Sequence, residues 1–334
     1  MAVVTHLPPW IAAQLQTLLL QRGHAWLLAG PSGLGQLDLA MALARAWLCE
    51  QPNRQGACGH CNSCHAIDVL THADLAVLMP ETTLLNLGWP LGEKAQDDID
   101  SKKRKPSKEI RVDAMRDTVE FAQRTSARGR GKVVLVFPAE RMNLITANAL
   151  LKTLEEPAGD LKFVLATEAA HLLLPTIRSR CLGHSMVWPD QPQALTWLAA
   201  QGLTPVQAAL SLRAAGGRVQ DAVHFAQLGD GWSQLPLAVL RGDVSWFKDW
   251  TPAQLVDALH KLCHDLQVLK ADAAPRFFEP SELAPLAQAS SWHSLSRWAR
   301  TLSDARRTVE HPFNAGLMQE ALISQAQLAL TSKT

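Results

Sequence analysis

Short apolar runs alternate with helical patterns along the first half of the chain. Four runs, at residues 25–29, 75–79, 133–137 and 163–166, have the length and composition of buried strands. Between them, apolar residues recur at helical spacing, as in the Ala- and Leu-rich segment 37–48. Strands that alternate with helices are typical of a parallel sheet covered on both faces. We therefore predict an α/β fold for this half of the chain.

Only helical patterns continue after about residue 186. A break that contains Gly, Trp and Pro, at residues 229–236, divides them into a short and a longer block. These changes of pattern predict three domains. They are an α/β domain at residues 1–185, a small helical domain at residues 186–230 and an all-α domain at residues 231–334.

Residues 81–108 interrupt the α/β domain with Gly, Pro and many charges. The second half of this segment has few large apolar side chains, so we expect an inserted surface loop that is poorly ordered. The basic run KKRK at residues 102–105 leaves a DNA-binding arm as the alternative.

The chain has 334 residues, is 47% hydrophobic and has a net charge of +1. It contains no apolar run near the roughly 18 residues that a membrane helix needs. Residues 1–10 lack the features of a signal peptide, so we expect a cytoplasmic protein with no membrane partner. Proteins that bind DNA phosphates usually have a clear excess of positive charge. The near-neutral charge therefore indicates that any DNA contact is shared with partner subunits.

The segment after the first strand pattern has the position of a phosphate-binding loop, G-x-x-x-x-G-K-[ST], whose backbone N–H groups cradle phosphates. Gly30 and Gly35 occupy the two required glycine positions, and Gly33 lies between them. The next two residues should be a Lys that pairs with the terminal phosphates and a Ser or Thr that holds magnesium. They are Gln36 and Leu37, so both reactive side chains are replaced.

The second half of such a site is normally an Asp-Glu pair at the end of a buried strand. Here the strand pattern ends at Phe137-Pro138 instead. Two independent losses on one scaffold predict a relative of an ATPase that does not hydrolyse ATP. A glycine-rich turn with no nucleotide ancestry is the alternative interpretation of the loop.

Four of the six cysteines have the spacing C-x8-C-x2-C-x2-C. In a reducing cytoplasm such a cluster indicates a metal before a disulfide. Four thiolates satisfy tetrahedral zinc and leave no open position, so the predicted role is structural. An Fe–S cluster and unliganded thiols stay open as alternatives. The remaining two, Cys181 and Cys263, are isolated, and we expect both to be small buried hydrophobes. The predicted ligands are Cys49, Cys58, Cys61 and Cys64.

These features together resemble the AAA+ clamp-loader family. The resemblance extends over residues 10–225 and implies an AAA+ P-loop domain with a zinc knuckle at residues 49–64, then a helical lid domain and a helical collar domain. The segment 81–108 is longer than the resemblance leads us to expect. The motifs that carry it are the loop at 30–37, the cysteine cluster, HAD at 72–74, NALLKTLEEP at 148–157 and IRSRC at 177–181.

The resemblance also implies roles for single residues. Arg180 corresponds to an arginine finger that reaches the ATP of a neighbouring subunit, and Arg178 is the second candidate. A guanidinium suits this role because it is planar and permanently charged. From the residues alone, a salt bridge within its own domain is the alternative for Arg180. Thr167 occupies the sensor position, whereas Gln220 replaces an Arg of the active members.

The function implied by the resemblance is that of a non-hydrolysing subunit of the DNA polymerase III clamp loader, which places the sliding clamp on primed DNA in the replisome at the nucleoid. The implied partners are the gamma/tau and delta clamp-loader subunits, the sliding clamp more weakly, and primer-template DNA through the assembly. Two other classes remain open. One is an ATP-hydrolysing AAA+ motor with an unusual P-loop, and the other is a zinc-ribbon module that binds nucleic acid.

Overall fold

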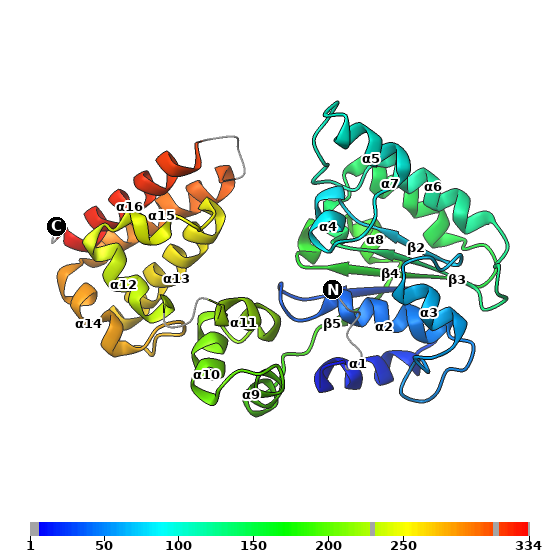
Figure 1. Ribbon diagram of the computed structural model, residues 1–334, viewed down its shortest axis with the longest axis horizontal. Helices are drawn as coiled ribbons and strands as arrows, with labels where there is room; N and C mark the ends of the chain where they lie inside the picture. Colours follow the sequence, from blue (N-terminus) through cyan, green and yellow to red (C-terminus); the bar gives the residue numbers. More distant parts are fainter. Residues whose placement is uncertain (1–6, 228–230, 310–313, 333–334) are drawn as a thin grey trace. The chain divides into compact units, whose positions relative to one another are not determined.

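The structure is a computed structural model that describes residues 7–227, 231–309 and 314–332. It divides into two compact units, Met1–Asp190 and Gln191–Thr334. The first unit contains a five-stranded parallel sheet with the order β2-β3-β4-β1-β5 (Figure 1). The strands are β1 (Ala25–Ala29), β2 (Leu75–Leu78), β3 (Lys132–Val136), β4 (Leu161–Thr167) and β5 (Leu182–Ser185).

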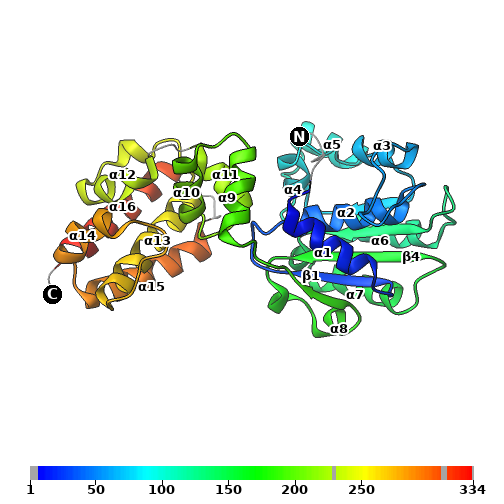
Figure 2. The same cartoon turned by 90° about the horizontal axis from the view of Figure 1, so that it is seen from below.

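Helices cover both faces of this sheet, as the apolar strand patterns predict. Trp26 and Leu28 of β1 are buried on one face, where the ring of Trp26 lies 4.7 Å from that of Trp47 in α2. Ala25 and Leu27 belong to the core on the other face, with α6 and α7. Figures 1 and 2 show the three layers. The longer helices are α1 (Pro9–Leu19), α2 (Gln36–Leu48), α6 (Val112–Gln123) and α7 (Leu144–Glu155), and the short ones are α3 (Asn62–Asp68) and α8 (Pro175–Arg178).

The α/β prediction is confirmed, and the four predicted strands are found within two residues of their expected bounds. The sequence pattern missed β5 because most of its short sequence, LGHS, is exposed. It does not have the apolar character of a buried strand. Its place in the sheet comes from parallel pairing with β1, for example Leu27 with Gly183.

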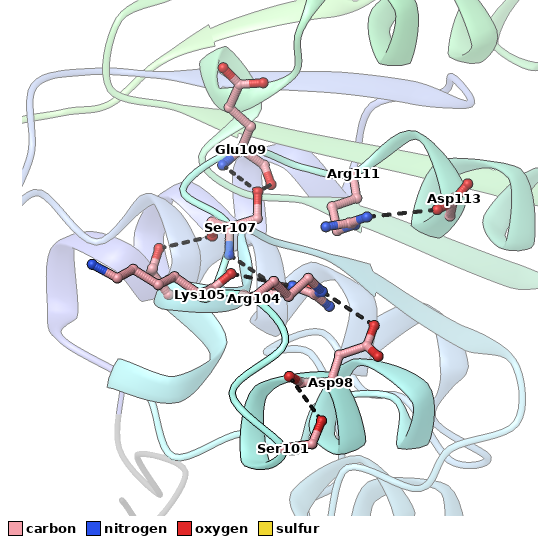
Figure 3. A network of polar contacts seen from close by, with 10 residues as sticks. Asp98, Ser101, Arg104, Lys105, Ser107, Glu109, Arg111 and Asp113 are labelled. Atoms are coloured by element: carbon pink, nitrogen blue, oxygen red, sulfur yellow. Dashed lines mark hydrogen bonds and ion pairs between the residues drawn. The ribbon is translucent and has the colours of Figure 1, made fainter.

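The segment 81–108 is not the loop predicted from its composition. It forms α4 (Glu81–Asn86) and α5 (Glu93–Asp100), and an ion pair connects its two ends (Figure 3). The guanidinium of Arg104 donates to both carboxylate oxygens of Glu81, at 2.5 and 2.8 Å, and the N–H of Ser107 donates to the same carboxylate at 2.8 Å. Although burial opposes ionisation of Glu81, these contacts outweigh it and lower the pKa of its carboxyl group.

The second unit is entirely helical in its described part. Its helices surround a core that includes Trp232, Phe247 and Phe278, and the rings of Trp232 and Phe278 stack at 4.7 Å. The predicted break at 229–236 lies partly outside the described residues, and the division into lid and collar domains remains a prediction. The helices are α9 (Gln191–Ala200), α10 (Pro205–Ala214), α11 (Val219–Ala226), α12 (Gly231–Arg241), α13 (Pro252–Lys270), α14 (Pro280–Ala289), α15 (Trp292–Thr308) and α16 (Ala315–Thr331).

No helix among the described residues combines the length and the apolar character that a membrane span requires.

The buried carboxylate of Asp74, just before β2, holds the loop that precedes β3. It has no exposed surface and accepts from the backbone N–H groups of Ala127 at 2.8 Å and Arg128 at 2.9 Å. The Ser126 hydroxyl donates to it at 3.0 Å, and Nζ of Lys132 lies 3.6 Å away. Burial alone would raise the pKa of Asp74, but these partners outweigh burial and lower it. The HAD motif at residues 72–74 is therefore a structural element of the sheet edge.

We expect Asp74→Asn to lower the free energy of unfolding by about 2–4 kcal/mol, because its amide NH₂ meets backbone donors in a buried site. The matched control, Asp160→Asn at an exposed ion pair with Lys162, should cost less than about 1 kcal/mol. Because the pKa of Asp74 is lowered on folding, its contribution is present above the ordinary value of 3.8 and disappears as the pH falls below it. Urea unfolding at pH 7 and on acidification measures both effects. An equal loss in the two variants would contradict the assignment.

Candidate functional site

The loop after β1 has the strand-loop-helix geometry of a phosphate-binding loop. Gly35 is the N-terminal cap of α2 and has φ 90°, a left-handed conformation that favours glycine. Gly33 also has a positive φ, of 80°. A Cβ added at Gly30 would lie 2.7 Å from Cβ of Met186, the residue that follows β5. The chain after β5 therefore passes so close to Gly30 that this position favours glycine. The structure thus places all three predicted glycines in one loop.

Gln36 closes this loop on itself. The residue is only 3% exposed, and its Nε2 donates to the carbonyl oxygens of Gly30 at 2.6 Å and Pro31 at 2.8 Å. In a phosphate-binding loop this position carries a Lys directed at the ligand. Here the amide satisfies the loop's own carbonyl groups, so the conformation is held by contacts that need no phosphate.

The end of β3 has a carboxylate that the sequence pattern did not predict. Phe137 and Pro138 are followed by a short 3-10 helix, η1 (Ala139–Arg141), which contains Glu140. The hydroxyl of the buried Thr167 donates to Oε2 of Glu140 at 2.6 Å, and the N–H of Glu168 donates to Oε1 at 3.2 Å. Glu140 lies beyond the position where the motif places its acidic pair, and only the parallel pairing of β3 with β4 brings it to Thr167.

Arg180 follows α8 at the surface and pairs with Glu155 at the end of α7. Its Nε donates to Glu155 Oε1 at 2.6 Å, its Nη2 contacts the same oxygen, and its Nη1 donates to the carbonyl oxygen of Thr176 at 2.8 Å. Its side chain is 33% exposed, and that of Glu155 is 47% exposed. In this chain taken alone, the guanidinium therefore makes the local salt bridge that sequence analysis kept as an alternative. Arg178 is exposed.

The four clustered cysteines converge at the end of α2 and the start of α3. Their sulfur atoms all lie within 4.8 Å of one another. The Sγ of Cys49 is 3.8 Å from that of Cys61 and from that of Cys64, and the sulfurs of Cys58 and Cys64 are 4.0 Å apart. A tetrahedron with metal–sulfur bonds of about 2.3 Å has edges of about 3.8 Å. The cluster therefore fits one tetrahedral metal ion such as zinc.

The environment of the thiols supports this fit. The N–H groups of Cys58 and Cys64 donate to the sulfurs of Cys49 and Cys61, at 3.2 and 3.4 Å, which are contacts typical of metal-binding thiolates. Burial raises the pKa of Cys49 and raises that of Cys64 to about 12. Cys49, Cys61 and Cys64 are buried and Cys58 is half-buried, and a bound cation would favour the thiolate form of all four. In a four-iron cluster each thiolate binds a different iron, so the four sulfurs must lie farther apart than around a single ion. The short distances between these sulfurs therefore favour a single ion.

The two remaining cysteines lie apart from this cluster. Cys263 is 1% exposed, and burial raises its pKa to about 12. Cys181 packs against the apolar core of the first unit, and burial raises its pKa to about 11. Both have the environment expected of small apolar side chains.

The glycine loop between β1 and α2, in a parallel sheet that helices cover on both faces, defines the first unit as a P-loop-type α/β fold. Comparisons with known proteins give the family. The sequence model of the family described as DNA polymerase III, delta subunit, matches residues 12–186, which is more than half of the chain. The chain belongs to this family.

Several relatives show how far the similarity extends. DNA polymerase III subunit delta' of Pseudomonas aeruginosa is 36% identical over 273 residues, covering 73% of this chain and 74% of the relative. The Escherichia coli protein of the same name is 31% identical, with coverage of 96% and 94%. Among solved structures, a gamma subunit-related protein from Thermotoga maritima has a TM-score of 0.46 at 16% identity, covering 96% of this chain and 99% of that chain.

Proposed function

We propose that this chain is a clamp-loader subunit of DNA polymerase III that does not hydrolyse ATP itself. The observation that carries the proposal is Gln36, which replaces the phosphate-binding Lys and binds the carbonyl groups of its own loop. Leu37 cannot ligate magnesium, and Phe137 and Pro138 replace the acidic pair. Glu140, the nearest carboxylate along the chain, accepts from Thr167 instead.

The chain contributes to catalysis in a neighbour through Arg180. Its pair with Glu155 is partly exposed, and such a pair contributes about 0–1 kcal/mol, so little free energy opposes its release. An arginine finger accelerates phosphoryl transfer by roughly 10³- to 10⁵-fold. The Arg180 guanidinium lies at the surface in a weak local ion pair. This supports a role in which it leaves Glu155 and contacts an ATP bound by the next subunit.

Two helical domains follow the α/β domain: a lid at residues 186–230 and a collar at residues 231–334 that holds the subunit in a ring. The partners are the gamma/tau and delta subunits, with the sliding clamp and primer-template DNA reached through the assembly in the cytoplasm, at the nucleoid. The cysteine cluster binds one structural zinc ion.

The purified chain is expected to show no magnesium-dependent ATP hydrolysis above a control without protein. Gln36→Lys should not restore it, because the magnesium ligand and the acidic pair remain absent. A phosphate-release assay with both proteins checks this. Turnover by the wild-type chain would instead support the ATP-hydrolysing motor.

Elemental analysis of the purified chain should find one zinc ion per chain. Cys61→Ser removes one thiolate and should lower the zinc content, whereas Cys181→Ser, outside the cluster, should leave it unchanged. The destabilisation should be confined to the cluster, which hydrogen exchange across residues 49–68 would detect. Iron with sulfide, or the same metal content in both variants, would refute the zinc assignment.

Arg180→Ala is expected to lower the ATPase rate of a loader reconstituted with clamp and primed DNA, while zinc content and assembly stay intact. The loss should be smaller than the roughly 10³-fold minimum for a single finger, because other sites retain their own fingers. Arg180→Lys should rescue poorly, since an ammonium lacks the planar fork.

Two matched variants separate a finger from a local salt bridge. Glu155→Ala removes the local partner and leaves Arg180 in place, so the ATPase rate should be maintained. Arg178→Ala tests the second candidate and should have little effect; a loss there, with Arg180→Ala unaffected, would assign the finger to Arg178. If Glu155→Ala and Arg180→Ala lower the rate equally, Arg180 acts only through its local pair.

A further inference from the structure

A cavity of about 890 Å³ lies beside β2, the strand at one edge of the sheet. Its lining includes Leu75 and Val77 of β2, and helices α4 and α5 of the inserted segment form part of its wall. This volume is within the range of about 300–1,000 Å³ that is usual for ligand sites. No predicted site residue lies in it, so the cavity is separate from the loop after β1 and from the cysteine cluster.

The backbone of β2 presents free hydrogen-bonding groups to this side. The carbonyl oxygens of Asp74 and Leu78 accept from Val133 and Phe137 N–H, at 2.9 and 3.0 Å, so the polar groups of even-numbered residues point toward β3. Because this direction alternates along a strand, the N–H and C=O groups of Val77 point away from β3. No described strand pairs with β2 on that side. Such an edge is a template for an additional strand.

The walls of the cavity differ on the two faces of the sheet. Leu70, just after α3, contributes apolar surface, and α3 contacts α2 on one face. Asp113 and Asp117, in the first turns of α6, contribute carboxylates from the other face, where α6 contacts β2. Successive side chains of an added strand point to opposite faces. They would therefore meet apolar surface and carboxylates in turn.

The net charge of the lining is negative. Five carboxylates and three cations line the cavity, an excess of two negative charges. Arg104 is already bound to Glu81 and lies 3.4 Å from Asp98, and Arg111 lies 4.0 Å from Asp113 (Figure 3). The carboxylates in the lining are Glu81, Glu93, Asp98, Asp113 and Asp117, and the cations are Lys94, Arg104 and Arg111.

We propose that the free edge of β2 binds an extended segment of a partner protein, in which apolar residues alternate with Lys or Arg. Main-chain hydrogen bonds to Val77 supply affinity, and the two walls of the cavity select the alternation. Apolar side chains of the segment pack against Leu70, and its cations face Asp113 and Asp117. The site goes beyond the ATPase-related role proposed for Arg180 and does not depend on it.

Fluorescence polarisation with the full chain tests this proposal, using a labelled peptide of about eight residues in which valine and lysine alternate, long enough to span the four residues of β2. Binding should protect the Val77 amide from hydrogen exchange. A peptide of the same composition with its lysines in one block should bind much more weakly. N-methylation of alternate peptide bonds on the pairing side should abolish binding, because it removes the main-chain donors.

Variants of the chain provide matched controls. Asp117→Lys should weaken binding about two- to fivefold, the effect of a partly exposed pair, whereas Glu120→Lys, on the same helix but outside the cavity lining, should not. Val77→Pro removes the N–H that points away from β3 and should abolish binding, and Val77→Ala should retain it. If Val77→Pro fails to fold, the N-methylated peptide tests the same hydrogen bonds. No binding at about 1 mM peptide, or equal binding of the blocked or N-methylated peptide, would overturn the proposal.

Discussion

Buried polar groups need hydrogen-bond partners, and this requirement governs the carboxyl edge of the sheet. In α/β proteins this edge is where ligands bind. Here the amide of Gln36 binds the carbonyl groups of the loop after β1, and Glu140 after β3 accepts from Thr167 after β4. Glu81, after β2, is bound by Arg104. The edge retains the geometry of a ligand site while its polar groups are satisfied within the chain.

The same requirement explains how each unit holds its irregular segments. Asp74 accepts two backbone N–H groups in the first unit, and in the second the fully buried Asp265 accepts those of Arg276, Phe277 and Phe278, at 3.0, 2.6 and 2.9 Å. A carboxylate can accept several donors at once, and charge-assisted hydrogen bonds are stronger than neutral ones. In each unit, a single carboxylate thus holds a loop whose backbone lacks the regular hydrogen bonds of a helix or sheet.

Sequence analysis predicted those features that depend on local pattern. Apolar runs gave four strands, and cysteine spacing gave a cluster whose sulfurs do converge. It failed where a partner lies far along the chain. In segment 81–108, Glu81 at the start of α4 pairs with Arg104, which is 23 residues away in a run of basic residues. Glu140 meets Thr167 only through strand pairing. The composition of a segment shows which charged residues it contains but not which of them pair. Segment 81–108 was therefore predicted to be a loop.

The inserted segment also changes what the edge strand β2 can do. An exposed edge invites pairing with another copy of the same chain, and proteins commonly prevent this with charges. Carboxylates of α5 and α6 surround the cavity beside β2, and β2 itself, LAVL, carries no charge. A second copy of β2 would bring no cation to those carboxylates, whereas a segment with lysines would. Arg104 binds Glu81 at the start of α4 and lies 3.4 Å from Asp98 of α5, so it holds two of the carboxylates that the insertion contributes to the cavity. The charges that discourage self-pairing are therefore the same charges that select a basic partner.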